Sequence, residues 1–252
     1  MNAKPPLRIL MSRAALAQIE SQLAPTMGTI PFVAVHPDQE SPNADIAFVS
    51  RDVTGLSTKH AVLPPTQQFY DAMRGSPLLA WVHVHSAGVD RPIFVELMAR
   101  GVQVSSSSGA NAGVVAQTAV AGLLALARCF PQLIAAQREH RWAPLIGSGL
   151  PRDLAGQTAI VVGWGAIGQR ITALLQMLEL HVVVVRRSAR PLANDGLETI
   201  AFDTLEAALP RADWLLLACP LTDRTRGLVD ARVLSLLPQG ACLVNVARGE
   251  VV

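Results

Sequence analysis

The sequence lacks the features that would assign it to several large classes of protein. Its formal net charge is only +2 at pH 7, which is too small and too dispersed to indicate a nucleic-acid-binding protein. The three cysteines, Cys129, Cys219 and Cys242, have neither metal-ligand spacing nor an even disulfide framework. We therefore expect cysteines that are small core side chains in a reducing compartment, no metal site and no nucleic-acid partner.

Signals for secretion and for membrane insertion are also missing. Residues 1–6 are too short and too polar to form a signal peptide. The run Ala112–Ala127 is almost wholly apolar, but it contains Gln117 and Thr118 and is shorter than the about 20 apolar residues of a bilayer span. We expect a helix that is buried between domains or subunits, in a soluble, cytoplasmic protein without a membrane partner.

The composition and the pattern of apolar runs favour two α/β domains. Half of the 252 residues are hydrophobic, which is enough for two buried cores. Short apolar runs alternate with helical patterns, which is typical of parallel sheets with helices on both faces. The serine-rich segment Ser105–Gly109 predicts a loop at the boundary. We expect domains at 1–105 and 106–252, the second including a long apolar helix from about 111 to 129.

The second domain is organised around the stretch Gly163-Trp164-Gly165-Ala166-Ile167-Gly168. A predicted buried strand, Thr158–Val162, comes before it, and a predicted helix, Gln169–Leu180, follows it. Strand, glycine turn and helix form the dinucleotide-binding fingerprint, although a glycine turn without a ligand is the alternative. Gly163 would allow the tight turn, Gly165 would let a pyrophosphate approach, and Gly168 would let the helix pack close to the strand.

The end of the next predicted strand, His181–Val185, bears on which dinucleotide is bound. In NAD-binding folds an Asp or Glu about 20 residues after the glycines binds the adenosine ribose hydroxyls. This sequence has Arg186-Arg187-Ser188 at that place. A carboxylate would repel a 2′-phosphate, whereas two guanidinium groups and a hydroxyl would bind one. We predict NADP(H) as the cofactor in preference to NAD(H); the alternative is two solvated arginines at a strand end.

Several segments from about residue 80 to the C-terminus resemble, in order and spacing, the D-isomer-specific 2-hydroxyacid dehydrogenases. This family contains glyoxylate and hydroxypyruvate reductases, D-lactate dehydrogenase and 3-phosphoglycerate dehydrogenase. The matching segments are Ser86–Asp90, Asn111–Gln117, the glycine turn, Cys219–Leu228 and Leu237–Gly249. The resemblance implies a Rossmann-type doubly wound parallel sheet, a flavodoxin-like α/β substrate domain, and a homodimer formed through the nucleotide domains.

The resemblance also implies roles for individual residues. The backbone at Ala87, Gly88 and Val89 would receive the substrate carboxylate, because a turn of small residues exposes its N–H groups. Arg248 takes the place of the catalytic arginine, whose planar and permanently charged guanidinium clamps the carboxylate and polarises the keto oxygen. The predicted contacts to the cofactor outside the three glycines and the Arg186–Ser188 segment are Ala166, Ile167, Cys219, Pro220, Thr225 and Ala247.

The sequence departs from the family pattern where the general acid is expected. In the family a histidine held by a glutamate follows the arginine segment, whereas this sequence ends at Val252. None of the six histidines is in a matching context. His83 and His85 would share one face of a strand, which could suggest a metal site or a proton relay, but a strand that leads into the carboxylate turn is the simpler interpretation.

We expect the sequence to be part of a longer polypeptide or a truncated product, because its last predicted strand would otherwise leave an apolar sheet edge open. The predicted function is the reduction of a small 2-keto acid, such as glyoxylate or hydroxypyruvate, to its D-2-hydroxy acid with NADPH. Such a reaction needs a proton for the developing alkoxide as well as the hydride. The alternative, supported by the missing acid, is a dinucleotide-binding sensor or interaction module without turnover, or an inactive fragment.

Overall fold

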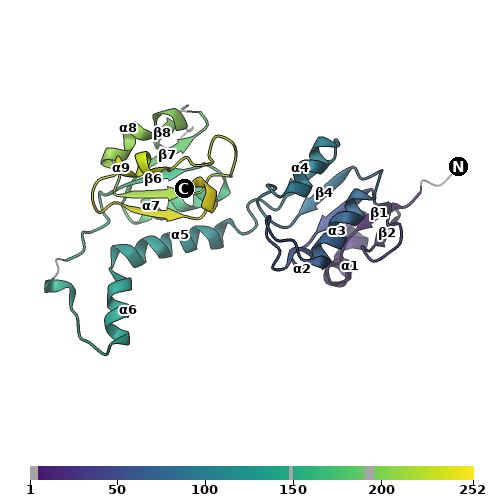
Figure 1. The fold of residues 1–252 in the computed structure, drawn as a ribbon, viewed down its shortest axis with the longest axis horizontal. Helices are drawn as coiled ribbons and strands as arrows, with labels where there is room; N and C mark the ends of the chain where they lie inside the picture. The colour runs from purple at the N-terminus through teal and green to yellow at the C-terminus, as the bar shows by residue number, and fades with distance from the viewer. Residues whose placement is uncertain (1–4, 148–149, 189, 191–195) are drawn as a thin grey trace. The chain divides into compact units, whose positions relative to one another are not determined.

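The computed structural model describes residues 5–147, 150–188, 190 and 196–252. Residues 1–4, part of the segment in which we expected no signal peptide, lie outside the described residues. The chain divides into two compact units, Met1–Ala110 and Asn111–Val252 (Figure 1). The division comes a few residues after the predicted boundary between residues 105 and 106.

The first unit is a parallel sheet with helices. Its strands are β1 (Leu7–Leu10), β2 (Phe32–Val35), β3 (Ile46–Val49), β4 (Trp81–Val84) and β5 (Gln103–Ser106). Its helices are α1 (Arg13–Met27), α2 (Arg51–Thr54), α3 (Pro64–Arg74) and α4 (Pro92–Ala99). The strand order is β2-β1-β3-β4-β5, and every pairing is parallel. This is the flavodoxin-like order, so the predicted fold of this unit is confirmed.

The serine-rich segment differs from the prediction. Ser105 and Ser106 belong to strand β5 rather than to a loop. The reason is visible at Ser105, whose side chain faces β4 and takes part in two hydrogen bonds there. Its Oγ accepts a hydrogen bond from Trp81 Nε1 at 2.7 Å and lies 2.9 Å from His83 Nδ1. The hydroxyl of a serine in a strand can therefore find its hydrogen-bond partners on the neighbouring strand, which composition alone does not reveal.

The second unit contains the other parallel sheet. Its strands are β6 (Thr158–Val162), β7 (His181–Arg186), β8 (Glu198–Ala201), β9 (Trp214–Leu217) and β10 (Cys242–Asn245). Its α-helices are α5 (Ala112–Ala127), α6 (Phe130–Arg138), α7 (Ala166–Met177), α8 (Leu205–Ala208) and α9 (Ala231–Ser235). Short 3₁₀ helices span Leu145–Gly147, Phe202–Thr204, Leu209–Arg211 and Gly249–Val251. The order β10-β9-β6-β7-β8 is that of a doubly wound Rossmann sheet, as predicted.

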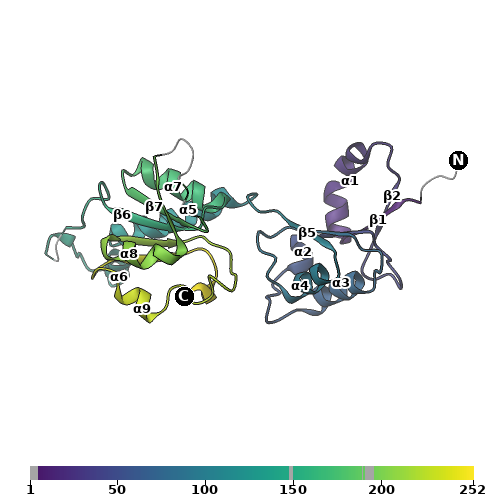
Figure 2. The same cartoon turned by 90° about the horizontal axis from the view of Figure 1, so that it is seen from above.

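Helices cover both faces of the second sheet, and this explains its apolar strands. Along β6, Val161 packs into a core that includes α5 and α7, whereas Ile160 and Val162 pack into a core that includes α8 and α9. Figure 2 shows α7 and α9 on opposite sides of the sheet. Strands that are buried on both faces read as continuous apolar runs rather than as an alternation. This burial is why the strands could be recognised in the sequence.

The long apolar helix α5 packs against α7 and β10 through its buried small and apolar residues. It ends at Ala127, and Cys129 takes a left-handed conformation with φ 55°. α6 then leaves at a 70° bend. Among the described residues no single helix is both long and apolar enough to cross a membrane; α5 and α6 satisfy length and composition only when they are taken together across the bend.

Candidate functional site

Two glycines of the turn after β6 are required by the packing of the chain itself. Gly163 has φ 110°, and a Cβ there would lie 2.8 Å from the backbone of Ala218. A Cβ at Gly168 would lie 3.0 Å from the carbonyl carbon of Gly163 and closer still to its oxygen. Helix α7 begins at Ala166 rather than at the predicted Gln169, so Ala166, Ile167 and Gly168 form its first turn. The close approach of the backbone after β9 explains Gly163, and the close packing of the first turn of α7 on Gly163 explains Gly168.

Gly165 is different, because no described residue hinders a side chain there. Its backbone is extended, with φ −81° and ψ −174°, and an added Cβ would meet no atom within 4 Å. Gly165 is also the N-cap of α7. The first N–H groups of a helix have no partner within it and, with the helix dipole, favour an anion. Open space at this glycine is therefore what a bound phosphate would need.

A cavity of about 630 Å³ lies beside the turn. The residues around it lie at or after the C-terminal ends of β6, β7, β8 and β9. They are Gly163, Trp164, Arg186, Arg187, Ser188, Phe202, Cys219, Pro220, Thr222, Asp223, Arg224 and Thr225. The neighbouring strands β6 and β9 mark the point at which the strand order reverses. Open α/β sheets bind ligands at this point, outside the carboxyl ends of the strands.

The cavity brings together residues that were predicted separately and adds others. Seven predicted cofactor contacts line it, namely Gly163, Arg186, Arg187, Ser188, Cys219, Pro220 and Thr225. Sequence reasoning missed Trp164, Phe202, Thr222, Asp223 and Arg224. Trp164 lies inside the fingerprint and could have been found there. The others are recognisable only once the strand order is known. The other predicted residues of the second unit are not among those that line this cavity; they are Gly165, Ala166, Ile167, Gly168, Ala247 and Arg248.

The wall of the cavity carries several positive charges. Arg186 is partly buried and donates from Nη2 to the carbonyl oxygen of Arg190 at 2.5 Å. Its Nε is buried and has no hydrogen-bond partner within the described part of the chain. Arg187 and Ser188 are exposed. Arg224 adds a third guanidinium, so the cavity favours an anionic ligand.

The loop after β9 is shaped by its own hydrogen bonds. Thr225 is buried, its Oγ1 donates to the carbonyl oxygen of Pro220 at 2.7 Å, and it accepts from the backbone N–H of Thr222 at 2.8 Å. The Thr225 hydroxyl therefore fixes the loop. Burial raises the pKa of the Cys219 thiol, which keeps it protonated and makes it a small apolar part of the wall.

Arg248 follows β10, and its backbone is held on both sides. The Asn245 side chain donates from Nδ2 to the carbonyl oxygen of Arg248 and accepts from the N–H of Ala247, both at 2.9 Å. On the other side, the N–H of Val229 donates to the carbonyl oxygen of Val251 at 2.9 Å, and the Val251 side chain is fully buried. The Arg248 side chain is exposed. Its Nη1 donates to the carbonyl oxygen of Ala247 at 2.9 Å. A well-held backbone with an exposed guanidinium suits a residue that binds an anionic substrate.

The predicted carboxylate-binding turn, Ala87, Gly88 and Val89, follows β4 in the first unit. Ala87 is exposed, Val89 packs against the core, and the Ser86 hydroxyl donates to the carbonyl oxygen of Gly88 at 3.0 Å. The turn is therefore anchored at one end and open at Ala87.

His83 and His85 are engaged with different residues. The ring of His83 stacks on Phe48, and its Nε2 lies 3.0 Å from Ser107 Oγ. The Nε2 of His85 lies 2.8 Å from Thr54 Oγ1. Burial and the positive charges of two neighbouring arginines lower the pKa of His85. Within the described residues there is no group of three or more potential metal ligands.

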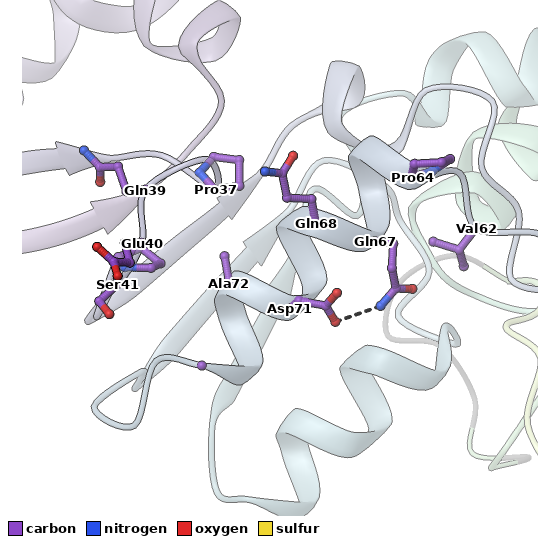
Figure 3. A pocket seen from close by; sticks show the side chains of 12 residues that line it. Pro37, Gln39, Glu40, Ser41, Val62, Pro64, Gln67, Gln68, Asp71 and Ala72 are labelled. Carbon is purple, nitrogen blue, oxygen red and sulfur yellow. Dashed lines mark hydrogen bonds between the residues drawn. The ribbon is translucent and has the colours of Figure 1, made fainter.

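A second cavity, of about 610 Å³, lies in the first unit between the segment after β2 and helix α3 (Figure 3). Gln39 and Glu40 line one side, and Gln67, Gln68 and Asp71 line the other. The Asp71 carboxylate already accepts a hydrogen bond from Gln67 Nε2 at 2.8 Å and pairs with an arginine of α3. None of the predicted site residues lines this cavity, and we assign no function to it.

Known proteins resemble the chain over both units. The family model for the NAD binding domain of the D-isomer specific 2-hydroxyacid dehydrogenases matches residues 120–252, just over half of the sequence. A D-3-phosphoglycerate dehydrogenase of Mycobacterium leprae is 33% identical over 184 residues, which cover 72% of this chain and 34% of that protein. A glyoxylate reductase of Thermococcus gammatolerans is 30% identical over 228 residues, covering 87% of this chain and 66% of the relative.

Solved structures agree with these matches. A D-isomer specific 2-hydroxyacid dehydrogenase from Xanthobacter autotrophicus Py2, solved in complex with NADPH and MES, has a TM-score of 0.71 and 27% identity. The match covers 99% of this chain and 74% of the neighbour. The chain thus spans only about a third to two thirds of the length of the curated relatives named above. On the match of the family model, the chain belongs to the D-isomer specific 2-hydroxyacid dehydrogenase family.

Proposed function

We propose that the chain binds NADP(H), in preference to NAD(H), in the cavity beside the glycine turn. Two observations support this proposal: Arg186, Arg187 and Ser188 line the cavity, and there is open space at Gly165, which directly follows the cavity residue Trp164 in the chain. The open space suits a pyrophosphate, and the wall suits a 2′-phosphate, because guanidinium groups bind phosphate oxygens in pairs. The structural neighbour from Xanthobacter, which was solved with NADPH, is consistent with this preference.

Calorimetric titration with NADPH and with NADH tests the preference. The wild-type protein should bind NADPH more tightly. Arg186→Asp should weaken NADPH binding by at least about tenfold, because a carboxylate at this strand end repels a phosphate, and it should leave NADH binding equal or tighter. A wild-type protein that binds NADH more tightly than NADPH would refute the preference.

The proposed reaction is the interconversion of a small 2-keto acid, such as glyoxylate or hydroxypyruvate, and its D-2-hydroxy acid. NADPH, when bound, would supply the hydride for reduction. In this proposal Arg248 clamps the carboxylate and polarises the keto oxygen, since its planar fork binds two oxygens and never loses its charge. The carboxylate-binding role predicted for the backbone N–H groups of Ala87, Gly88 and Val89 is kept as part of this proposal. This proposal names no residue as the general acid that gives the proton to the alkoxide.

Arg248→Lys tests the role of the planar guanidinium, because lysine keeps the positive charge but cannot bind two oxygens in parallel. We expect kcat/KM for glyoxylate or hydroxypyruvate to fall by about a hundredfold, as on loss of one strong donor to a developing charge, while the Kd for NADPH stays unchanged. Consumption of NADPH with each 2-keto acid gives the first quantity, and calorimetry the second. A wild-type protein that binds NADPH but turns over no 2-keto acid would favour the non-catalytic sensor.

Exposed apolar side chains support a homodimer formed through the second unit. Phe130 and Ile134 on α6 are 50% and 45% exposed, and Trp142, Ile146 and Leu150 after it are 90%, 80% and 74% exposed. Apolar side chains of this size that gather in one stretch of chain mark an interaction surface. A second copy of the chain is the partner we propose, and light scattering coupled to size-exclusion chromatography tests it.

A further inference from the structure

Arg224 lines the nucleotide cavity, although neither the glycine fingerprint nor the end of β7 contains it. It lies in the loop after β9. Its guanidinium is 5.8 Å above the centroid of the Phe202 ring, and its Nη2 donates to the Asp203 carboxylate at 2.9 Å. The backbone of the loop is fixed by the hydrogen bonds of Thr225. Arg224 is therefore an exposed cation held at a defined place on the cavity wall.

The charges on the wall show what Arg224 could bind. Arg186, Arg187 and Arg224 line the same cavity, and among the described residues Asp223 is the single carboxylate that lines it with them. Three guanidinium groups against one carboxylate leave an excess of positive charge. A phosphate monoester carries about −1.5 to −2 charges at pH 7, which is more than one arginine neutralises. The adenosine 2′-phosphate is the part of NADP(H) that has this charge and that NAD(H) lacks.

The ion pair between Arg224 and Asp203 is weak enough to be exchanged. The two side chains are 53% and 83% exposed. An exposed pair of this kind contributes little to stability, because water screens it. A phosphate offers paired oxygens and a larger charge to the same guanidinium, so it competes well with one solvated carboxylate. The stacking of Arg224 on Phe202 does not need Asp203 and can keep the side chain at the wall.

We propose that Arg224 is a specificity-determining residue that binds the adenosine 2′-phosphate, and that it exchanges its ion pair with Asp203 for one with this phosphate. The inference rests on the proposed binding of NADP(H). It makes Asp203 a competitor for Arg224 in the free protein. Removal of the arginine and removal of its competitor should therefore change NADPH binding in opposite directions, which a merely structural ion pair would not do.

The test is calorimetric titration of the wild-type protein, Arg224→Gln and Asp203→Asn with NADPH, NADH, 2′,5′-ADP and 5′-AMP. Arg224→Gln should weaken binding of the two ligands with a 2′-phosphate by about fivefold and leave NADH and 5′-AMP unchanged. Asp203→Asn should tighten binding of the same two ligands by a smaller factor. In the double variant the Asp203→Asn change should have no effect, because its partner is gone.

Arg232→Gln is the matched control. Arg232 is also an exposed arginine paired with a carboxylate, that of Glu206, but it does not line the cavity. This variant should bind all four ligands as the wild type does. If Arg224→Gln weakens NADPH and NADH by the same factor, Arg224 holds the adenine and the inference is overturned. An NADPH-preferring wild type with an unchanged preference in Arg224→Gln overturns this inference alone, whereas a wild type that binds neither dinucleotide overturns the proposed function as well.

Discussion

Adding one methyl group should lower the stability of the protein at Gly168, but at Gly165 it should weaken cofactor binding and leave stability nearly unchanged. At Gly168 the new Cβ would lie 3.0 Å from the carbonyl carbon of Gly163 and closer still to its oxygen. Both atoms belong to the backbone, so they cannot turn away, and α7 must move from the strand. Such overpacking costs about 1–3 kcal/mol or more. Alanine gains about 1 kcal/mol of helix propensity over glycine, which offsets only part of this cost.

At Gly165 the same methyl meets no atom of the described part of the chain within 4 Å, and the extended backbone suits alanine. We therefore expect Gly165→Ala to change the free energy of unfolding by less than about 1 kcal/mol. The methyl does, however, occupy the space that a pyrophosphate needs. The Kd for NADPH should rise by at least about tenfold, since a phosphate that moves away loses charge-assisted hydrogen bonds from the start of α7.

Urea unfolding and calorimetry on both variants check these two effects. Gly168→Ala should have a lower urea midpoint with an unchanged slope, because the native state is strained while the denatured state is not. Gly165→Ala should have the wild-type midpoint and weak NADPH binding. A Gly165→Ala protein that binds NADPH as the wild type does would show that no phosphate approaches this residue. A wild-type midpoint for Gly168→Ala would refute the packing argument.

Three further predictions concern other parts of the second unit. Trp142→Ser should lower the molar mass measured by light scattering from that of a dimer toward that of a monomer, because it removes the most exposed large apolar side chain of the proposed interface. Asn245→Ala should lower kcat/KM for a 2-keto acid without changing NADPH binding, since it removes both side-chain hydrogen bonds that hold the backbone next to Arg248. Cys219 should react more slowly with iodoacetamide in the native protein than in urea when followed by mass spectrometry, because burial raises the pKa of its thiol and the thiolate is the reactive form.

The strands of the second unit could be predicted because both faces of its sheet are buried. Continuous apolar runs such as Thr158–Val162 and the run that contains β9 leave little choice of element. The start of α7 was placed three residues late, because the apolar periodicity becomes visible only after Gly168, whereas the helix already begins inside the glycine turn. Ser105 and Ser106 were assigned to a loop because their composition is that of a loop. Their pairing with β4 depends on a neighbour that lies far away in the sequence.

The candidate site could be predicted only where a residue keeps a fixed distance from the glycine turn. Arg186 is such a residue, since the length of one helix and one strand sets its place. Phe202 and Arg224 follow different strands, and only the order β9-β6-β7-β8 brings their loops to one cavity. For Thr225 the sequence predicts the position of the residue but not its hydrogen bonds. It lines the cavity as predicted, but the structure shows its hydroxyl bonded within its own loop, which no sequence motif states.

The loop that lines the nucleotide cavity and the segment that carries Arg248 are joined by backbone hydrogen bonds. Directly after Thr225, the N–H groups of Gly227 and Val229 donate to the carbonyl oxygens of Glu250 and Val251 at 2.8 and 2.9 Å. A change that displaces this loop therefore displaces the backbone next to Arg248 as well. The Arg248 side chain itself is exposed, and its Nη1 donates to the carbonyl oxygen of Ala247 at 2.9 Å. A variant at Arg248 that loses turnover but keeps the wild-type Kd for NADPH therefore reports on chemistry, whereas a loss that follows disruption of the loop reports on cofactor binding and chemistry together.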